Sequence, residues 1–327
     1  MQMKRYLATL AIVIATPAMG QAATEWQLAN EYPATSLPGE GDVYFAKLVA
    51  EKTKGKITII PVPDAKLGFK SREQLKAVAE GKVPMADSFG GAIAEDVPVL
   101  GFSSLPFLAA DIAQARFLYK ASRTAYETAF ERHNQKLLYA TPWPPSGIWA
   151  KEPVTTVETL SRLKIRTYDL TGSLVFMSLG SKASLVSFAE LPAKIASGEI
   201  DAVLSSGDGG AGRKLWEHFP QFTAINYAIP LSFTTVNLDR WKALDDGLRR
   251  ALEDAAFETE LHQWKALDGR LEQNYERMRA NGMTIVTEVP LPLRTRLREA
   301  AKAAIDEWST KAGPDGAALL AAKDRKQ

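Results

Sequence analysis

The chain has 327 residues, of which 46% are hydrophobic and 24% charged, which is typical of a globular protein with about two domains. It contains no cysteine, which excludes disulfides, thiolate metal sites and cysteine nucleophiles. Basic and acidic residues balance once Lys4 and Arg5 of the leader are set aside. This balance argues against nucleic acid or an anionic membrane surface as the partner.

Residues 1–22 have the organisation of a secretory signal peptide. Lys4 and Arg5 precede an apolar run over 6–16 that is too short to span a bilayer, and the small residues Gly20 and Ala22 follow. We therefore expect cleavage near Ala22 and a periplasmic mature protein.

The first half of the mature chain alternates between strand and helix patterns. Strands are expected at 25–29, 57–62 and 83–89. Helices are expected over 43–53, with Asp42 as N-cap, and over 72–80, with Ser71 as N-cap. This order predicts a parallel sheet with helices on its faces.

A helical pattern at 112–133 and a strand at 136–141 lead to Pro142, Pro144 and Pro145, where we expect the chain to leave the first lobe. Residues 163–206 then repeat the alternation of strands and helices. A long helical pattern over about 245–280 could lie across both lobes. The last helix is expected at 293–311, followed by a frayed tail.

These patterns predict an α/β fold of two lobes. Each lobe is expected to hold a mainly parallel sheet flanked by helices, with the long helix spanning both. The predicted boundaries are 23–143 plus about 232–270 for lobe I, and 144–231 plus about 271–327 for lobe II.

Parallel sheets bind ligands at the carboxyl ends of their strands. Arg166, Ser187, Phe188, Ser205 and Ser206 all fall near such ends, and Arg166 is the only charged residue among them. An arginine can hold a carboxylate through two parallel hydrogen bonds, although a surface charge at a strand end would give the same pattern. Further candidates for the wall of an apolar cleft are the aromatic residues Phe89, Trp143 and Trp149, each of which could instead belong to a core.

Gly207, Gly209 and Gly212 form a G-x-G-x-x-G pattern, which is formally a dinucleotide fingerprint. The pattern lies late in the chain, and no acidic residue follows about twenty positions on. A flexible loop, or helix N-terminal amides that help to bind an anion, are alternative interpretations. An α/β enzyme that uses a nucleotide at Gly207–Gly212 therefore stays as the rival hypothesis.

Other signs of catalysis are missing from the sequence. His133, His218 and His262 have no metal-ligand spacing, and there is no G-x-S-x-G motif. We expect neither a cofactor nor a metal, and we expect a monomer that is not an enzyme.

Several ordered segments resemble the DctP-type solute receptors of tripartite ATP-independent periplasmic (TRAP) transporters. The resemblance covers about residues 26–308 and is carried by FAKLVAEKTKGKITIIPVPDAKLG, EQLKAVAEGKVPMAD, SLPFL, LSRLKIRTY, SLGSKASLVSFAELPAKIASGEIDAV and NLDRWKAL. In that family the arginine of the K-I-R strand pairs with the ligand carboxylate, so the resemblance implies this role for Arg166. It also implies ligand contacts by Phe188 and Ser205.

Two departures narrow what the resemblance implies. Leu204 stands where some relatives carry a metal-binding glutamate, so no metal is expected. Ser146 stands where sialic-acid receptors have a second arginine. The implied function is binding of a small organic carboxylate and its delivery to TRAP membrane subunits. The aromatic candidates Phe89, Trp143, Trp149 and Phe188 predict an apolar or aromatic body for this ligand. A receptor for a sensor kinase or an ATP-driven importer is a further alternative.

Overall fold

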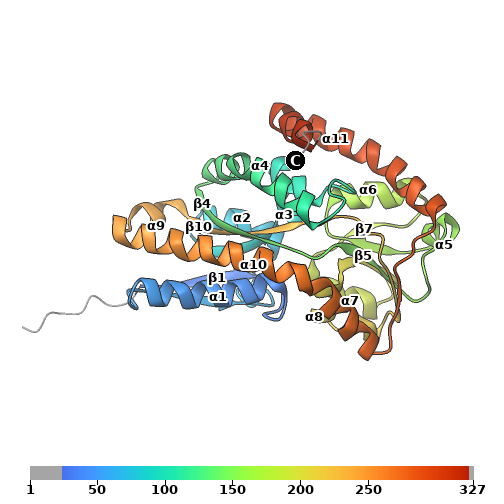
Figure 1. Cartoon of the computed structure of the whole chain (residues 1–327), viewed down its shortest axis with the longest axis horizontal. Coiled ribbons are helices and arrows are strands. Elements are labelled where there is room, and N and C mark those ends of the chain that lie inside the picture. The colour runs from blue at the N-terminus through green and yellow to red at the C-terminus, as the bar shows by residue number, and fades with distance from the viewer. Residues whose placement is uncertain (1–23, 324–327) are drawn as a thin grey trace, which may run out of the picture.

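A computed structural model describes residues 24–323, so the expected signal peptide at 1–22 lies outside the described residues. The first sheet defines lobe I (Figure 1). Its order is β2-β1-β3-β10-β4, with β1 at Thr24–Asn30, β2 at Ile57–Val62, β3 at Met85–Phe89, β4 at Gln135–Pro142 and β10 at Leu231–Asn237.

The second sheet defines lobe II. Its order is β11-β9-β5-β8-β6-β7, with β5 at Ser146–Ala150, β6 at Ile165–Thr167, β7 at Ser184–Leu185, β8 at Ala202–Ser206, β9 at Gln221–Thr223 and β11 at Thr284–Val286.

Each sheet is mainly parallel, as predicted, and contains one strand that runs against its neighbours. In lobe I this strand is β10, and in lobe II it is β5. Each of them is the first strand after the chain arrives from the other lobe. The crossing segments, 143–145 and 224–230, therefore lie side by side, and Trp143 N donates a hydrogen bond to Pro230 O over 2.8 Å.

Helices cover both sheets. Those of lobe I are α1 (Leu37–Lys52), α2 (Ser71–Ala79), α3 (Gly90–Ile93), the 3₁₀ helix η1 (Pro98–Ser104), α4 (Ile112–Glu131) and α9 (Leu238–Lys242). Those of lobe II are α5 (Val157–Ser161), α6 (Leu170–Ser178), η2 (Phe188–Glu190), α7 (Leu191–Ala196), α8 (Gly207–Gly212) and η3 (Leu215–Glu217).

Helix α10 (Asp246–Ala280) spans both lobes, which confirms the prediction of a long crossing helix (Figure 1). Asp245 caps it by accepting a hydrogen bond from Leu248 N at 2.8 Å. Its first half packs against α1 of lobe I, where Leu252 is buried, and its second half packs against α8 of lobe II, where Met278 is buried.

The C-terminal segment is helical, and the prediction of a frayed tail was wrong. Helix α11 (Leu291–Lys323) continues past a kink at Gly313, whose φ of +61° suits only glycine. Trp308 Nε1 donates to Pro98 O at 2.7 Å, and Leu319 is buried in the core of lobe I. Since α11 also packs on α6 of lobe II, it is a second helix that contacts both lobes. The residue boundaries of the lobes stay a prediction.

The start of α1 also differs from the expectation. Ser36 is the N-cap, and its Oγ accepts from Gly39 N at 3.3 Å. Asp42 lies inside the helix, where its side chain accepts hydrogen bonds from Asn30 Nδ2 (2.7 Å) and the Tyr139 hydroxyl (3.0 Å). Burial is the main factor that raises the pKa of Asp42. This carboxyl serves the core of lobe I and not a helix end.

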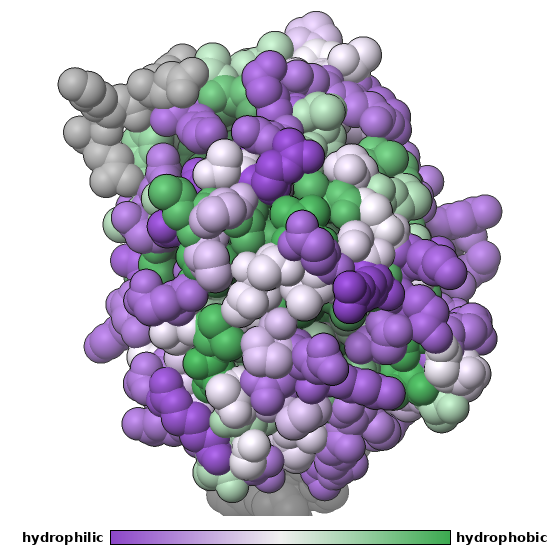
Figure 2. Space-filling view, turned by 90° about the vertical axis from the view of Figure 1, so that its right-hand side faces the viewer, coloured by the Kyte–Doolittle hydropathy of each residue, from purple (hydrophilic) through white to green (hydrophobic). Residues whose placement is uncertain are grey.

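The surface mixes both kinds of side chain. Figure 2 shows one face on which small hydrophobic patches lie between hydrophilic residues. Within the described range 24–323, no helix combines the length and the apolar character that a bilayer crossing requires.

Candidate functional site

A small cavity lies between the lobes, where the carboxyl ends of parallel strands from both sheets meet. Strands β1 and β3 of lobe I lead into Tyr32 and Phe89, and β6 and β8 of lobe II carry Arg166 and Ser205. The complete lining is Tyr32, Phe89, Trp143, Ser146, Arg166, Tyr168, Phe188, Ser205, Ser206, Gly209 and Pro230. The location follows the rule for open α/β sheets.

Arg166 is the charged residue of this cavity, and it is only 2% exposed. Its Nε donates to Val186 O at 2.8 Å, and its Nη1 donates to Leu204 O at 3.1 Å. These two carbonyls fix the plane of the guanidinium. Within residues 24–323 no carboxylate pairs with Arg166, although other buried or half-buried arginines such as Arg270 have one. Burial lowers the pKa of Arg166, although the nearby acidic groups Tyr32 and Glu31 oppose this shift without forming an ion pair with the guanidinium.

Aromatic rings form the walls. Tyr32 lies with its ring centroid 4.6 Å from that of Phe188 and 4.7 Å from that of Trp143. Phe89 contacts Tyr168 edge-on at 5.1 Å. The guanidinium of Arg166 lies 5.9 Å from the centre of the Phe188 ring. Burial raises the pKa of the Tyr32 phenol, so this group stays neutral and does not balance the arginine charge.

Hydroxyl groups supply the remaining polar atoms. Tyr168 donates to Ser146 Oγ at 3.3 Å, and Ser206 caps α8 by accepting from Gly209 N at 3.1 Å. Trp143 Nε1 is already engaged, since it donates to Ser232 Oγ at 3.1 Å. One buried cation, several hydroxyls and five aromatic side chains suit a small anion with an apolar body.

The cavity is narrow because the aromatic rings fill most of the space between the lobes. Its volume is about 20 Å³, which accommodates little more than one water molecule. A ligand of several carbon atoms can therefore enter only if the lobes or the rings move apart.

Six of the eight residues predicted from the sequence line this cavity: Arg166, Phe188, Ser205, Ser206, Phe89 and Trp143. The structure places the other two elsewhere. Trp149 is fully buried in lobe II, where its Nε1 donates to Ser206 O at 3.3 Å and its ring packs on Phe222. Side chains alternate along a strand, so Trp149 lies on the opposite face of β5 from Ser146. Ser187 donates from its hydroxyl to Glu190 Oε2 at 2.6 Å and does not line the cavity.

Sequence reasoning missed Tyr32, Ser146, Tyr168 and Pro230 as lining residues, and it considered Gly209 only as part of the glycine-rich pattern. Tyr32 follows β1 and Tyr168 follows β6, so the rule used for Arg166 could have found both. Pro230 could not be found in this way, because it lies on the crossing segment, whose position depends on how the two lobes are arranged.

The glycine-rich pattern at 207–212 forms helix α8 instead of the flexible loop that was considered. Its glycines allow close packing. A Cβ at Gly210 would lie 2.0 Å from Trp149 Cζ2, and one at Gly212 would lie 3.1 Å from Pro33 Cγ of lobe I. Asp208 within the pattern is buried and pairs with Arg270 of α10. Packing thus accounts for the glycines, and the acidic residue is engaged by the protein itself.

A second buried carboxyl lies near the cavity. Asp169 caps α6 by accepting from Gly172 N at 2.6 Å. Burial raises the pKa of Asp169 to about 7, although the hydrogen bond from Gly172 N and the charge of Arg166 oppose this shift. No group of three or more histidine, aspartate or glutamate side chains that could hold a metal occurs within residues 24–323.

Comparison with known proteins decides the family. The profile of DctP, the bacterial extracellular solute-binding proteins of family 7, matches residues 28–311. The chain belongs to this family.

Solved structures agree with the family assignment. The DctP-family chain is similar to DctP7 of Bordetella pertussis, an extracytoplasmic solute receptor that binds pyroglutamic acid. The two chains are 27% identical and superpose with a TM-score of 0.89, and the match covers 93% of this chain and 100% of DctP7. It is also similar to DctP6 of the same organism, with 30% identity, a TM-score of 0.88 and the same coverage. A further relative is the periplasmic 2,3-diketo-L-gulonate-binding protein YiaO of Escherichia coli, 24% identical over 287 residues, which are 86% of each chain.

The DctP-family protein is thus a periplasmic solute receptor of a TRAP transporter and not an enzyme. The rival hypothesis of a nucleotide-using enzyme finds no support among these relatives.

Proposed function

We propose that this receptor binds a small organic monocarboxylate in the cavity between its lobes and delivers it to TRAP membrane subunits. The observation that carries the proposal is the buried guanidinium of Arg166, which has two hydrogen bonds to carbonyl oxygens and no carboxylate partner within residues 24–323. A ligand carboxylate would supply the missing counter-ion and make charge-assisted hydrogen bonds in a site without bulk water.

The body of the ligand is apolar and small in this proposal. The rings of Tyr32, Phe89 and Phe188 offer flat apolar walls, whereas a second cation for a dicarboxylate is absent from the lining residues. Pyroglutamate, which three similar receptors bind, fits these demands. It has one carboxylate, an apolar ring edge, and a lactam whose N–H and C=O need partners such as the hydroxyls of Ser146 and Ser205.

Binding takes place by closure of the lobes. The ligand reaches Arg166 and Phe188 of lobe II while the cleft is open, and closure then brings Tyr32 and Phe89 of lobe I against it. Ligand that contacts both lobes stabilises the closed conformation, because only that conformation offers all the contacts. The lobe boundaries given above, with bends at 143–145 and 224–230, belong to this proposal.

A thermal-shift series followed by isothermal titration tests the function. Pyroglutamate and other small monocarboxylates should raise the melting temperature, since a ligand that binds only the folded state stabilises it. Succinate should have a weaker effect, and ATP and NAD should have none. Stabilisation by nucleotides but by no carboxylate would contradict the proposal.

Two further parts of the proposal concern the mature protein. We propose cleavage near Ala22 and a monomeric receptor. Mass spectrometry of the exported protein should give an N-terminus near Ala23, and light scattering should give the mass of one chain. Retention of Met1 or the mass of a dimer would refute the corresponding part.

A further inference from the structure

Glu31 joins the two lobes although it does not line the cavity. It follows β1 of lobe I and is only 2% exposed. Its Oε2 accepts a hydrogen bond from Ser71 N of lobe I at 2.9 Å, which holds the side chain in place. Its Oε1 accepts from Ala189 N in η2 of lobe II at 2.9 Å. The second bond can exist only while the lobes are closed.

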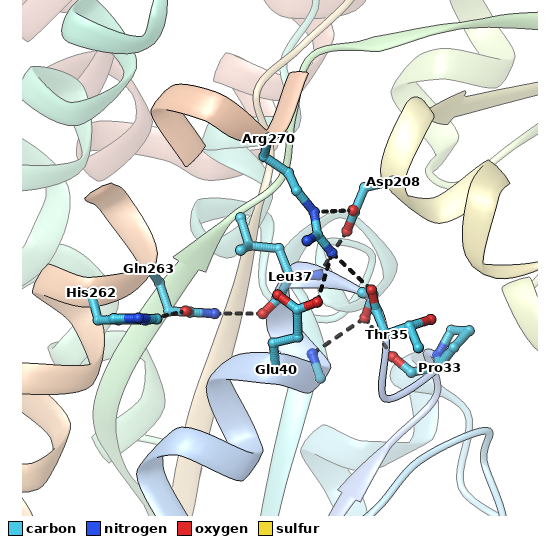
Figure 3. A network of polar contacts seen from close by, with 10 residues as sticks. Pro33, Thr35, Leu37, Glu40, Asp208, His262, Gln263 and Arg270 are labelled. Carbon is cyan, nitrogen blue, oxygen red and sulfur yellow. Dashed lines mark hydrogen bonds and ion pairs between the residues drawn. The ribbon is translucent and has the colours of Figure 1, made fainter. Parts of the chain in front are cut away.

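Asp208 forms the reciprocal contact from lobe II (Figure 3). Its Oδ1 accepts from Arg270 Nε of α10 at 2.5 Å, and its Oδ2 accepts from Leu37 N, the first amide of α1 in lobe I, at 2.7 Å. Arg270 also donates from Nη2 to Thr35 O at 2.8 Å and to Glu40 Oε1 at 3.1 Å. A carboxylate at a helix N-terminus satisfies a free N–H group and interacts favourably with the helix dipole.

The contacts of Glu31 and Asp208 have common features that distinguish them from the ion pairs between the lobes. Each carboxylate is almost completely buried and uses one oxygen for a backbone amide of the opposite lobe. The other oxygen of Glu31 is held within lobe I by Ser71 N, whereas that of Asp208 pairs with Arg270 of the crossing helix α10. By contrast, the ion pairs Lys70–Glu190 (3.0 Å) and Arg213–Asp64 (3.6 Å) also join the lobes but are partly exposed. Solvent and salt weaken such pairs.

We propose that Glu31 and Asp208 are two positioning residues, an interlobe latch, that hold the closed receptor together and slow the release of ligand without contacting it. The inference rests on the proposed function for its link to ligand release, but not for the latch itself. Hydrogen bonds from backbone amides to buried carboxylates are stronger than neutral ones, and opening the lobes leaves both amides without these partners.

A distance measurement tests the latch without any ligand. The chain has no cysteine, so spin labels can be attached at Lys47→Cys on α1 and Ala196→Cys at the end of α7, both at exposed positions. Double electron–electron resonance then measures the distance between the two spin labels. It compares the otherwise unmodified protein with Glu31→Gln, Asp208→Asn and the double variant. Each substitution keeps the shape of the side chain. If melting curves show that one single variant does not fold, the other single variant still tests the latch.

We expect the population with changed interlobe distances to grow in each single variant and to grow further in the double variant. Asp245→Asn is the matched control, because Asp245 also accepts from a helix N-terminal amide but does so within α10 alone. Distance distributions that stay the same in both single variants would overturn the latch.

The kinetic part uses pyroglutamate as the probe in stopped-flow binding. Loss of a hydrogen bond to a charged group should raise the dissociation rate by about tenfold to hundredfold, while the association rate changes much less. Asp245→Asn should match the unmodified receptor. If pyroglutamate does not bind at all, the choice of ligand fails and the distance measurement decides on the latch. If it binds and neither variant speeds release, the latch is refuted and the binding function stands.

Discussion

Tyr32 of lobe I and Phe188 of lobe II face each other across the cavity with ring centroids 4.6 Å apart. The two rings come from sequence positions 156 residues apart, and they meet only because the lobes are closed. Phe188 also lies beneath two guanidinium groups, 5.1 Å from Arg213 and 5.9 Å from Arg166. This ring therefore lies in the contact between the lobes and also packs against the arginine of the cavity.

Phe188→Ala should weaken ligand binding by about one to two decades, because the ligand loses an aromatic wall and Tyr32 loses its partner across the cleft. Isothermal titration with pyroglutamate measures this effect. Tyr32→Phe keeps the ring contact and should stay within about threefold of the unmodified receptor. Equal affinity of Phe188→Ala and the unmodified receptor would show that the ring serves only the core.

Arg166→Ala should weaken binding by roughly two to four decades, since removing one partner of a buried ion pair costs about 3–5 kcal/mol. Arg166→Lys keeps the charge but not the planar pair of donors, and its affinity should fall between the other two. Titration measures the affinities, and melting curves check the fold. Arg298→Ala is a suitable control, because Arg298 also lies over an aromatic ring, Phe107, but outside the cavity. Unchanged affinity in Arg166→Ala would remove the basis of the proposed function.

Trp143 and Trp149 should respond differently to the same substitution. Trp149→Phe removes the hydrogen bond to Ser206 O and leaves a void in lobe II, so the free energy of unfolding should fall by about 1–3 kcal/mol with little change in affinity. Trp143→Phe changes the cavity wall and should mainly reduce affinity. Urea unfolding and titration on both variants separate the effects. A large loss of affinity confined to Trp149→Phe would reverse the assignment.

Asp169 should make stability depend on pH in a defined direction. Burial raises its pKa to about 7, whereas an aspartate in an unfolded chain has a pKa of about 4. Between these values the unfolded chain has lost a proton that the folded protein retains. The protonated carboxyl of Asp169 therefore stabilises the folded protein relative to the unfolded chain. This stabilisation is fully present below about pH 4 and is lost as the pH rises through about 7.

Asp169→Asn removes this dependence, and asparagine can still cap α6. Relative to the unmodified protein, the free energy of unfolding of the variant should increase between about pH 4 and pH 7 by up to about 4 kcal/mol and then stay constant. Urea unfolding at a series of pH values measures the difference. A difference that does not change over this range would show that Asp169 ionises normally in the folded protein.

The sequence by itself determined the features that depend on local periodicity. The alternation of short β-branched runs with helical patterns predicted two α/β lobes, and the unbroken helical pattern over about 245–280 predicted α10. The position of Arg166 in a strand of a parallel sheet predicted that it lies at the edge where the cavity is found, because the carboxyl ends of parallel strands lie at one edge.

Only the tertiary structure decided which side chains face the cavity. Trp143 and Trp149 are chemically equal and six positions apart, but Trp143 lies on the crossing segment, whereas Trp149 lies on the face of β5 opposite to Ser146. The helical C-terminal segment and the contacts of Glu31 and Asp208 likewise depend on partners that are more than a hundred residues away. Local patterns fix strands and helices through interactions between neighbours, whereas burial and interlobe hydrogen bonds depend on surfaces that exist only after the two lobes have packed together.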